Sequence, residues 1–145
     1  MKAENLHLGC GAKKIWGFCN VDVRDNGQEV VDDCARLESF EDNSAAIIYH
    51  SHFAEHLTRQ EALTAMKRWY DVLKPGGELF MAVPDLERVF EHYVFFKDLK
   101  KLRGFLYGGQ DYKENCHYTG WDFKTLKEDL ENTGFKDVLL FDRWK

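Results

Sequence analysis

Short apolar runs alternate along the chain with segments in which apolar residues recur every three or four positions. The short runs predict β-strands, and the spaced segments predict amphipathic helices. The predicted strands are, in chain order, 6–8, 19–23, 29–31, 45–49, 79–83 and 138–141. Parallel neighbours need crossover connections, so strands that alternate with helices favour a mostly parallel sheet. The pattern predicts an α/β fold with a doubly wound, mostly parallel sheet covered on both faces.

Capping residues divide the helical segments into three predicted helices. Each begins after a residue whose side-chain oxygen can accept hydrogen bonds from the first turn, namely Thr58, Asp85 or Asp122. Thr58 is followed three residues later by Glu61, which is the pattern of a capping box. The first helix is expected to end at 74–77, the second at the glycines 104, 108 and 109, and the third at Gly134.

Composition and charge indicate an ordinary globular protein. The 145 residues are 44% hydrophobic and 31% charged, with a net charge of −5, and we expect residues 1–145 to form a single domain. The acidic balance argues against nucleic-acid binding driven by net charge, and the basic cluster at 97–103 is interpreted as a solvated helix face.

We recognise neither a membrane-spanning run nor a secretory signal, so a cytoplasmic location is expected. The four cysteines form no C-x-x-C pair and are interpreted as reduced thiols.

Glycines and acids follow the predicted strands at the edge where ligands bind in such sheets. Gly9 and Gly11 allow the main chain to turn sharply and to approach a ligand closely. The two oxygens of Asp22 can accept hydrogen bonds from both hydroxyls of a ribose. Asp33 can accept from an adenine amine, and the Cys34 amide can donate to a ring nitrogen. Each feature alone is common in turns and solvated loops, but together they predict a nucleoside ligand.

Four stretches resemble the class I S-adenosylmethionine-dependent methyltransferases, in particular small bacterial ones. They are LHLGCGAKKIWGFCNVDV, VVDDCARLESFEDNSAAIIYHSHFAEHL, LKPGGELFMAVPDL and, more loosely, CHYTGWDFKTLKEDLENTGF. The resemblance implies a Rossmann-like methyltransferase fold, S-adenosylmethionine as cofactor and methyl transfer by in-line displacement. It leaves open an edge strand that is missing or supplied by another chain, and with it a homo-oligomer. The interval from Gly11 to Asp22 implies a short first crossover.

The resemblance also implies the cofactor-binding residues. Gly9, Cys10 and Gly11 would lie under the methionine part of the cofactor, with His50 also near it. Asp22 would hold the ribose hydroxyls, Asp33 the adenine amine and Cys34 the adenine ring. The family's loop usually has a third glycine where Lys13 stands.

The acceptor is expected to be a small or glycan-like molecule. An acceptor hydroxyl or protonated amine needs a base to remove its proton. His117 is the candidate, because it lies beside Tyr118 in the glycine-rich loop where the family commonly builds its acceptor site. A loop histidine without a catalytic role fits the sequence equally well.

Three other functions compete with methyl transfer. The residues His50, His52 and His56 form an H-x-H-x-x-x-H pattern that can bind zinc or iron, as in a metal-dependent hydrolase. The positions that follow lack the Asp-His pair of such hydrolases, so no metal is expected. A nicotinamide-dependent oxidoreductase would need a glycine at Lys14 and a later acid. A non-catalytic module that binds the cofactor or a partner stays open.

Overall fold

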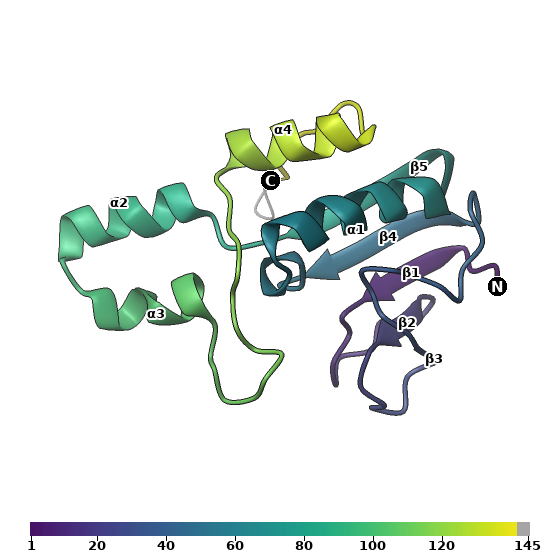
Figure 1. Cartoon of the computed structure of the whole chain (residues 1–145), viewed down its shortest axis with the longest axis horizontal. Helices are drawn as coiled ribbons and strands as arrows, with labels where there is room; N and C mark the ends of the chain where they lie inside the picture. The colour runs from purple at the N-terminus through teal and green to yellow at the C-terminus, as the bar shows by residue number, and fades with distance from the viewer. Residues whose placement is uncertain (142–145) are drawn as a thin grey trace.

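The computed structural model describes residues 1–141 and is built on a five-stranded parallel sheet (Figure 1). The strands are β1 (Asn5–Leu8), β2 (Cys19–Asp22), β3 (Val30–Val31), β4 (Ala45–Ser51) and β5 (Leu73–Ala82). Their order is β3-β2-β1-β4-β5, and all neighbours are parallel. The order reverses between β1 and β4, so the carboxyl ends of these two strands form the switch point where such sheets bind ligands. The predicted α/β class is confirmed.

The core lies between one face of the sheet and α1 (Arg59–Val72). Leu6 and Leu8 of β1 and Ile48 of β4 are fully buried on that face, and Trp69 of α1 is buried against them. The indole Nε1 of Trp69 donates a 2.8 Å hydrogen bond to the carbonyl of Cys34. The largest buried side chain is therefore held to the segment that follows β3.

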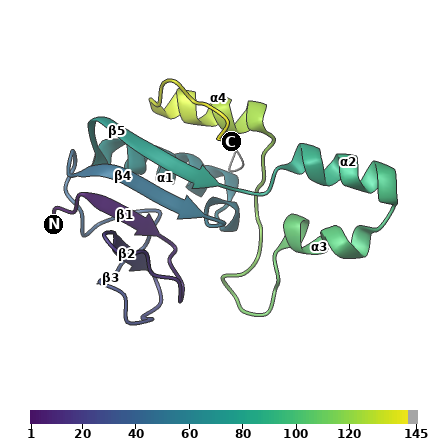
Figure 2. The ribbon, with the colours of Figure 1, turned by 180° about the vertical axis from the view of Figure 1, so that it is seen from behind.

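The prediction that helices cover both faces is wrong for the described residues. Figure 1 shows α1 across one face, with α4 (Phe123–Thr133) packed beside it, and Figure 2 shows the other face with no helix of residues 1–141 crossing it. The cause is the length of the connections. Residues 9–18 join β1 to β2 and residues 23–29 join β2 to β3, and neither loop contains a helix. The short first crossover is confirmed.

The predicted capping residues of all three helices are confirmed. Asp85 caps α2 (Leu86–Phe96), and Asp122 caps α4, which ends at Gly134 with a φ of 117°. The second predicted helix is nevertheless two helices, because α3 (Leu99–Tyr107) begins after a left-handed residue at Lys97 and a new cap at Asp98. Gly104 lies inside α3 and does not interrupt it. A single glycine costs a helix only about 1 kcal/mol, whereas a cap starts a new helix axis.

The hairpin of α2 and α3 projects past the carboxyl ends of the strands (Figures 1 and 2). It leaves several aromatic side chains exposed, including Phe90, Phe95, Phe96 and Phe105. Within residues 1–141, no helix is long and apolar enough to cross a membrane. The hairpin thus flanks the end of the sheet at which the predicted site lies.

The predicted strand at 138–141 is absent. These residues form no backbone hydrogen bonds with β5, and Leu139, Leu140 and Phe141 are mostly exposed. An extended segment becomes a strand only when its amides and carbonyls are paired. β5 is also longer than predicted, because it begins at Leu73 and includes an irregular stretch at 74–77 before regular pairing resumes at Glu78.

Thr58→Ala tests the capping box of α1. The Thr58 hydroxyl oxygen accepts a bond from the Glu61 amide, and the Glu61 carboxylate accepts one from the Thr58 amide at 2.9 Å. We expect the substitution to lower the free energy of unfolding by about 1 kcal/mol in urea denaturation. Thr64→Ala, the same change in the exposed middle of α1, is the control and should cause no loss. Equal stability of the two variants would contradict the role of the cap.

Candidate functional site

The loop after β1 exposes its main chain at Gly11. Gly9 and Gly11 have φ values of 63° and 52°, which favour glycine. A Cβ at Gly9 would lie 3.1 Å from the ring of Phe53, so the loop also packs tightly there. Among the described residues, apart from Gly11 and its two chain neighbours, no atom lies within 4 Å of the corresponding point at Gly11. A ligand can therefore approach the main chain at Gly11 from the open side.

Asp22 lies at the end of β2 and binds the glycine loop. Its Oδ2 accepts a 2.8 Å hydrogen bond from the Gly11 amide, and its Oδ1 accepts one of 2.9 Å from the Arg24 amide. The residue is nearly buried, which holds its carboxylate in one orientation. Each carboxylate oxygen has two lone pairs. Both oxygens can therefore still accept a hydrogen bond from a ligand hydroxyl.

Asp33 and Cys34 follow β3 on the same side of the sheet. Asp33 is exposed, and its carboxylate accepts a bond from the Ala35 amide while lying 3.5 Å from Arg36. The Cys34 thiol is buried and accepts a 3.2 Å bond from the Gly9 amide. Burial is the main cause that raises the pKa of Cys34 to about 12, so the thiol stays neutral. The Cys34 amide donates to no residue between 1 and 141 and can serve a ligand.

Cys10 and His50 are both buried. The Cys10 amide donates to the Val21 carbonyl at 3.1 Å, and burial raises the pKa of its thiol. The His50 ring lies 4.7 Å from the Trp69 ring, and neither ring nitrogen has a partner among residues 1–141. Burial lowers the pKa of His50 to about 3, so the ring is neutral. The roles assigned to these two residues in cofactor binding stay predictions.

His117 lies apart from the glycine loop, beside His56 at the end of the sheet. The two imidazole rings are 4.8 Å apart, and the Nδ1 of His117 donates to the Phe105 carbonyl at 3.0 Å. The Tyr118 amide donates to the Glu55 carbonyl at 2.9 Å and fixes the loop on this side. The loop also reaches the segment after β2, because the Arg24 guanidinium lies 4.6 Å from the ring centre of Tyr112 and the Arg24 amide donates to Asp22.

The histidines of the H-x-H-x-x-x-H pattern do not form one metal site. His50 is enclosed in the core, and the Nδ1 of His52 lies 3.0 Å from the Glu55 carboxylate, which raises the pKa of His52. The alternative of a hydrolase-like metal site built from these three residues therefore has no support among residues 1–141. The set of possible metal ligands among residues 1–141 is Glu55, His56 and His117.

Sequence reasoning missed three residues at this end of the sheet. They are Arg24, Glu55 and Tyr112. Glu55 lies within the EHL segment quoted above, so an acid directly before His56 was visible in the sequence, although its burial was not. Nothing in the sequence pairs Arg24 with Tyr112, because that contact depends on how the long loop folds back.

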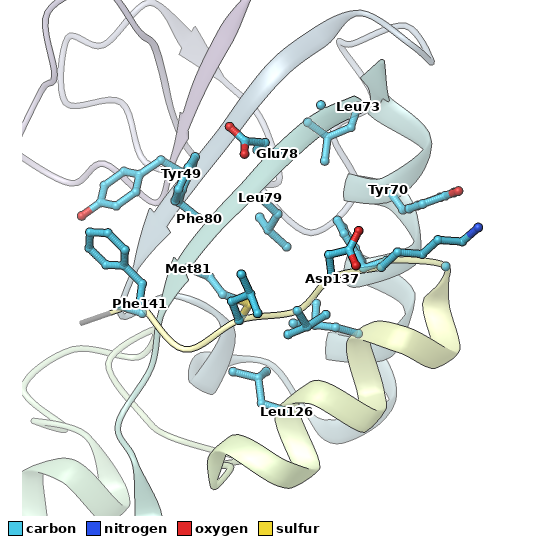
Figure 3. Close-up of a pocket in the computed structure, with 18 of the residues that line it drawn as sticks. Tyr49, Tyr70, Leu73, Glu78, Leu79, Phe80, Met81, Leu126, Asp137 and Phe141 are labelled. Atoms are coloured by element: carbon cyan, nitrogen blue, oxygen red, sulfur yellow. The ribbon is translucent and has the colours of Figure 1, made fainter. Parts of the chain in front are cut away.

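A large groove lies elsewhere, along β5 and α4. It has a volume of about 1420 Å³ and is lined mainly by β5, α4 and the segment after α4. Figure 3 shows Tyr49, Phe80 and Phe141 at one end of the groove and Tyr70 and Asp137 at the other. None of the predicted cofactor residues lines it. Because it lies along the sheet edge and away from the switch point, we do not assign the cofactor to this groove.

Comparisons with known proteins identify the fold. Residues 18–81 match the family model described as a methyltransferase domain. An Archaeoglobus fulgidus S-adenosylmethionine-dependent methyltransferase superposes with a TM-score of 0.66 at 22% identity, over 94% of this chain and 62% of that one. A Methanosarcina mazei S-adenosylmethionine-dependent methyltransferase superposes with a TM-score of 0.61 at 18% identity, over 91% of this chain and 79% of that one. A search of curated sequences gave no match.

A larger enzyme shares the fold as well. Phosphoethanolamine N-methyltransferase 2 of Haemonchus contortus, solved with S-adenosylmethionine, gives a TM-score of 0.57 at 22% identity, over 94% of this chain and 34% of that one. The chain has the Rossmann-like fold of these S-adenosylmethionine-dependent methyltransferases, and its residues 18–81 are similar to the methyltransferase-domain family. It spans 62% of the length of the A. fulgidus relative.

His50→Leu tests the burial of a neutral imidazole. The pKa of His50 is about 3 in the folded protein and about 6.5 when unfolded, so the unfolded chain binds one more proton between these values. The wild type should therefore lose stability relative to the variant as pH falls below 6.5, by about 1.4 kcal/mol per pH unit. Urea denaturation of both proteins at pH 7.5 and pH 5 measures the difference. Parallel pH dependence of the two proteins would contradict the buried neutral state.

Proposed function

We propose that the chain binds S-adenosylmethionine at the carboxyl ends of β1, β2 and β3 and transfers its methyl group to a small or glycan-like acceptor. The observation that carries the proposal is the bond between the Gly11 amide and the Asp22 carboxylate. It joins an open main-chain turn to an oriented acid at one corner of the sheet. A nucleoside needs both features, because its hydroxyls require paired acceptors and its sugar must approach the backbone closely.

The residues at this corner suit the parts of the cofactor. Gly9, Cys10 and Gly11 form the floor under the methionine part, and Asp22 accepts the ribose hydroxyls. The exposed carboxylate of Asp33 accepts from the adenine amine, and the free amide of Cys34 donates to the ring. His50 supports the floor from β4, on the inner side of Phe53. The cofactor, when bound, supplies a methyl group made electrophilic by its sulfonium.

The acceptor end is formed by His117 and the hairpin of α2 and α3. The Nδ1 of His117 donates to a carbonyl, so its Nε2 carries the lone pair that can take a proton from the acceptor. The exposed rings of the hairpin, such as Phe95 and Phe96, offer apolar surface beside the strand ends. The remaining contribution to catalysis is the positioning of the acceptor, because methyl transfer requires the acceptor atom to approach in line with the methyl group and the sulfur.

Asp22→Asn tests the ribose contact. The substitution keeps the shape and removes the charge, and a hydrogen bond to a charged group contributes about 1.5–3 kcal/mol. We expect S-adenosylmethionine to bind about 10- to 100-fold more weakly in calorimetric titration. Asp25→Asn removes an exposed acid three residues further along the same loop and is the matched control. Unchanged affinity in a folded Asp22→Asn variant would remove this residue from the proposed site.

His117→Ala tests the proton acceptor. Once a methyl acceptor has been identified from 14-unit mass shifts in small molecules incubated with the protein, the variant should transfer more slowly by about 100-fold. Its affinity for S-adenosylmethionine should stay within a factor of two of the wild type. His92→Ala, which removes an exposed histidine of α2, should leave turnover unchanged. Equal turnover of His117→Ala and wild type would exclude the residue as the base.

A further inference from the structure

We propose that Glu55, His56 and His117 together bind one divalent transition-metal ion such as Zn²⁺. The proposal concerns a site separate from the corner of the sheet assigned to the cofactor. Each residue contributes one ligand atom, and these atoms all lie within 4.8 Å of one another. Bonds of about 2.0–2.2 Å hold the ligands of one zinc ion at most about 4.4 Å apart. Small side-chain rotations are therefore enough to close the set around an ion.

Both imidazoles are held in the tautomer that a metal requires. The Nδ1 of His56 lies 3.1 Å from the Cys116 carbonyl, and the Nδ1 of His117 lies 3.0 Å from the Phe105 carbonyl. A carbonyl oxygen can only accept, so each Nδ1 carries the hydrogen. Each Nε2 of the neutral ring then carries a free lone pair. A ligating histidine whose other nitrogen donates to a carbonyl is the usual arrangement around protein-bound metals.

Glu55 supplies an oxygen without any partner. The residue is fully buried, its Oε1 lies 3.0 Å from the Nδ1 of His52, and its Oε2 has no hydrogen-bond partner among residues 1–141. A buried carboxylate oxygen that lacks a partner is costly. An ion in contact with it would satisfy this oxygen. His52 would then act as the outer partner that orients the carboxylate.

The main chain holds the three residues in place. The Tyr118 amide donates to the Glu55 carbonyl, and the His117 amide donates to the Tyr107 carbonyl at 3.2 Å. Gly108 has a φ of 76° and no room for a side chain, because the Asn115 carbonyl lies against it. The loop is thus fixed at its start and at its end. The ligands come from a region that needs little reordering when an ion binds.

The ligand set indicates which ion binds. Two imidazole nitrogens and one carboxylate oxygen suit zinc and related first-row metals, whereas magnesium and calcium prefer oxygen ligands alone. Three protein ligands leave one position of a tetrahedral ion open. His56 and His117 are half-buried, so that position can face solvent. The ion would bind the lone pair of the His117 Nε2, which in the proposed function accepts a proton from the methyl acceptor. His117 can therefore hold a metal ion or accept a proton, but not both at the same time.

Direct titration tests the proposal without any methyl acceptor. The chelator-treated full chain is titrated with Co²⁺, followed by its visible absorption, and with Zn²⁺ in competition with a chromogenic chelator. We expect one ion to bind per chain, and the visible absorption of the bound Co²⁺ to be that of an ion with a low coordination number. His56→Ala and His117→Ala should each lower the affinity at least about 100-fold. His92→Ala is the matched control and should bind like the wild type.

Glu55→Gln provides a second measurement that does not depend on the histidines. It keeps the side-chain shape and should weaken binding about 10-fold or more, and a urea unfolding curve of each metal-free variant verifies its fold. Less than one ion per wild-type chain at micromolar concentration would overturn the proposal. Wild-type affinity in both histidine variants would also overturn it, because the ion would then lie elsewhere. S-adenosylmethionine affinity, measured on the metal-free protein, reports separately on the proposed function.

Discussion

Three successive amides of one turn fix the geometry on which the site depends. Gly9 donates to the Cys34 thiol, Cys10 to the Val21 carbonyl and Gly11 to the Asp22 carboxylate. These bonds join the loop after β1 to the end of β2 and to the segment after β3. Because no helix connects β1 with β2, they replace the packing that a crossover helix would supply. Asp22 is therefore both a structural acceptor and the proposed ligand-binding acid.

Because no helix joins β1 to β2 or β2 to β3, the sheet face opposite α1 is buried unevenly. On the face opposite α1, the Nδ1 of His7 lies 2.8 Å from the Asn20 Oδ1, which also accepts from the Ile15 amide. The loop after β1 thus covers the β1 and β2 side of that face. Towards the sheet edge the cover ends, and Phe80 of β5 is 40% exposed. Polar pairs with satisfied bonds are stable in such a thinly covered position, whereas large apolar groups there leave surface in contact with water.

Local signals predicted the features that depend on neighbouring residues. The first five strands, the cap at Thr58 and the glycine turn beside Asp22 follow from short-range chemistry and from the rule for strand ends. The segment 138–141 has a strand-like composition, but composition does not determine pairing, and the segment forms no backbone hydrogen bonds with β5, the edge strand of the described sheet. The burial of His50 depends on Trp69, nineteen residues further along the chain, so the sequence could not show it. Likewise, Glu55 and His117 meet only because the loop after α3 folds back.

That loop couples the two ends of the proposed site. Near its tip, Tyr112 stacks with Arg24, whose amide donates to Asp22. Further along, Tyr118 is bonded to the Glu55 carbonyl next to the histidine pair. A segment fixed at both points sets the spacing between the cofactor corner and the groups that would face an acceptor. In the proposed function, in-line transfer tolerates little misplacement, so the spacing set by this loop would decide whether the two halves of the proposed site can act together.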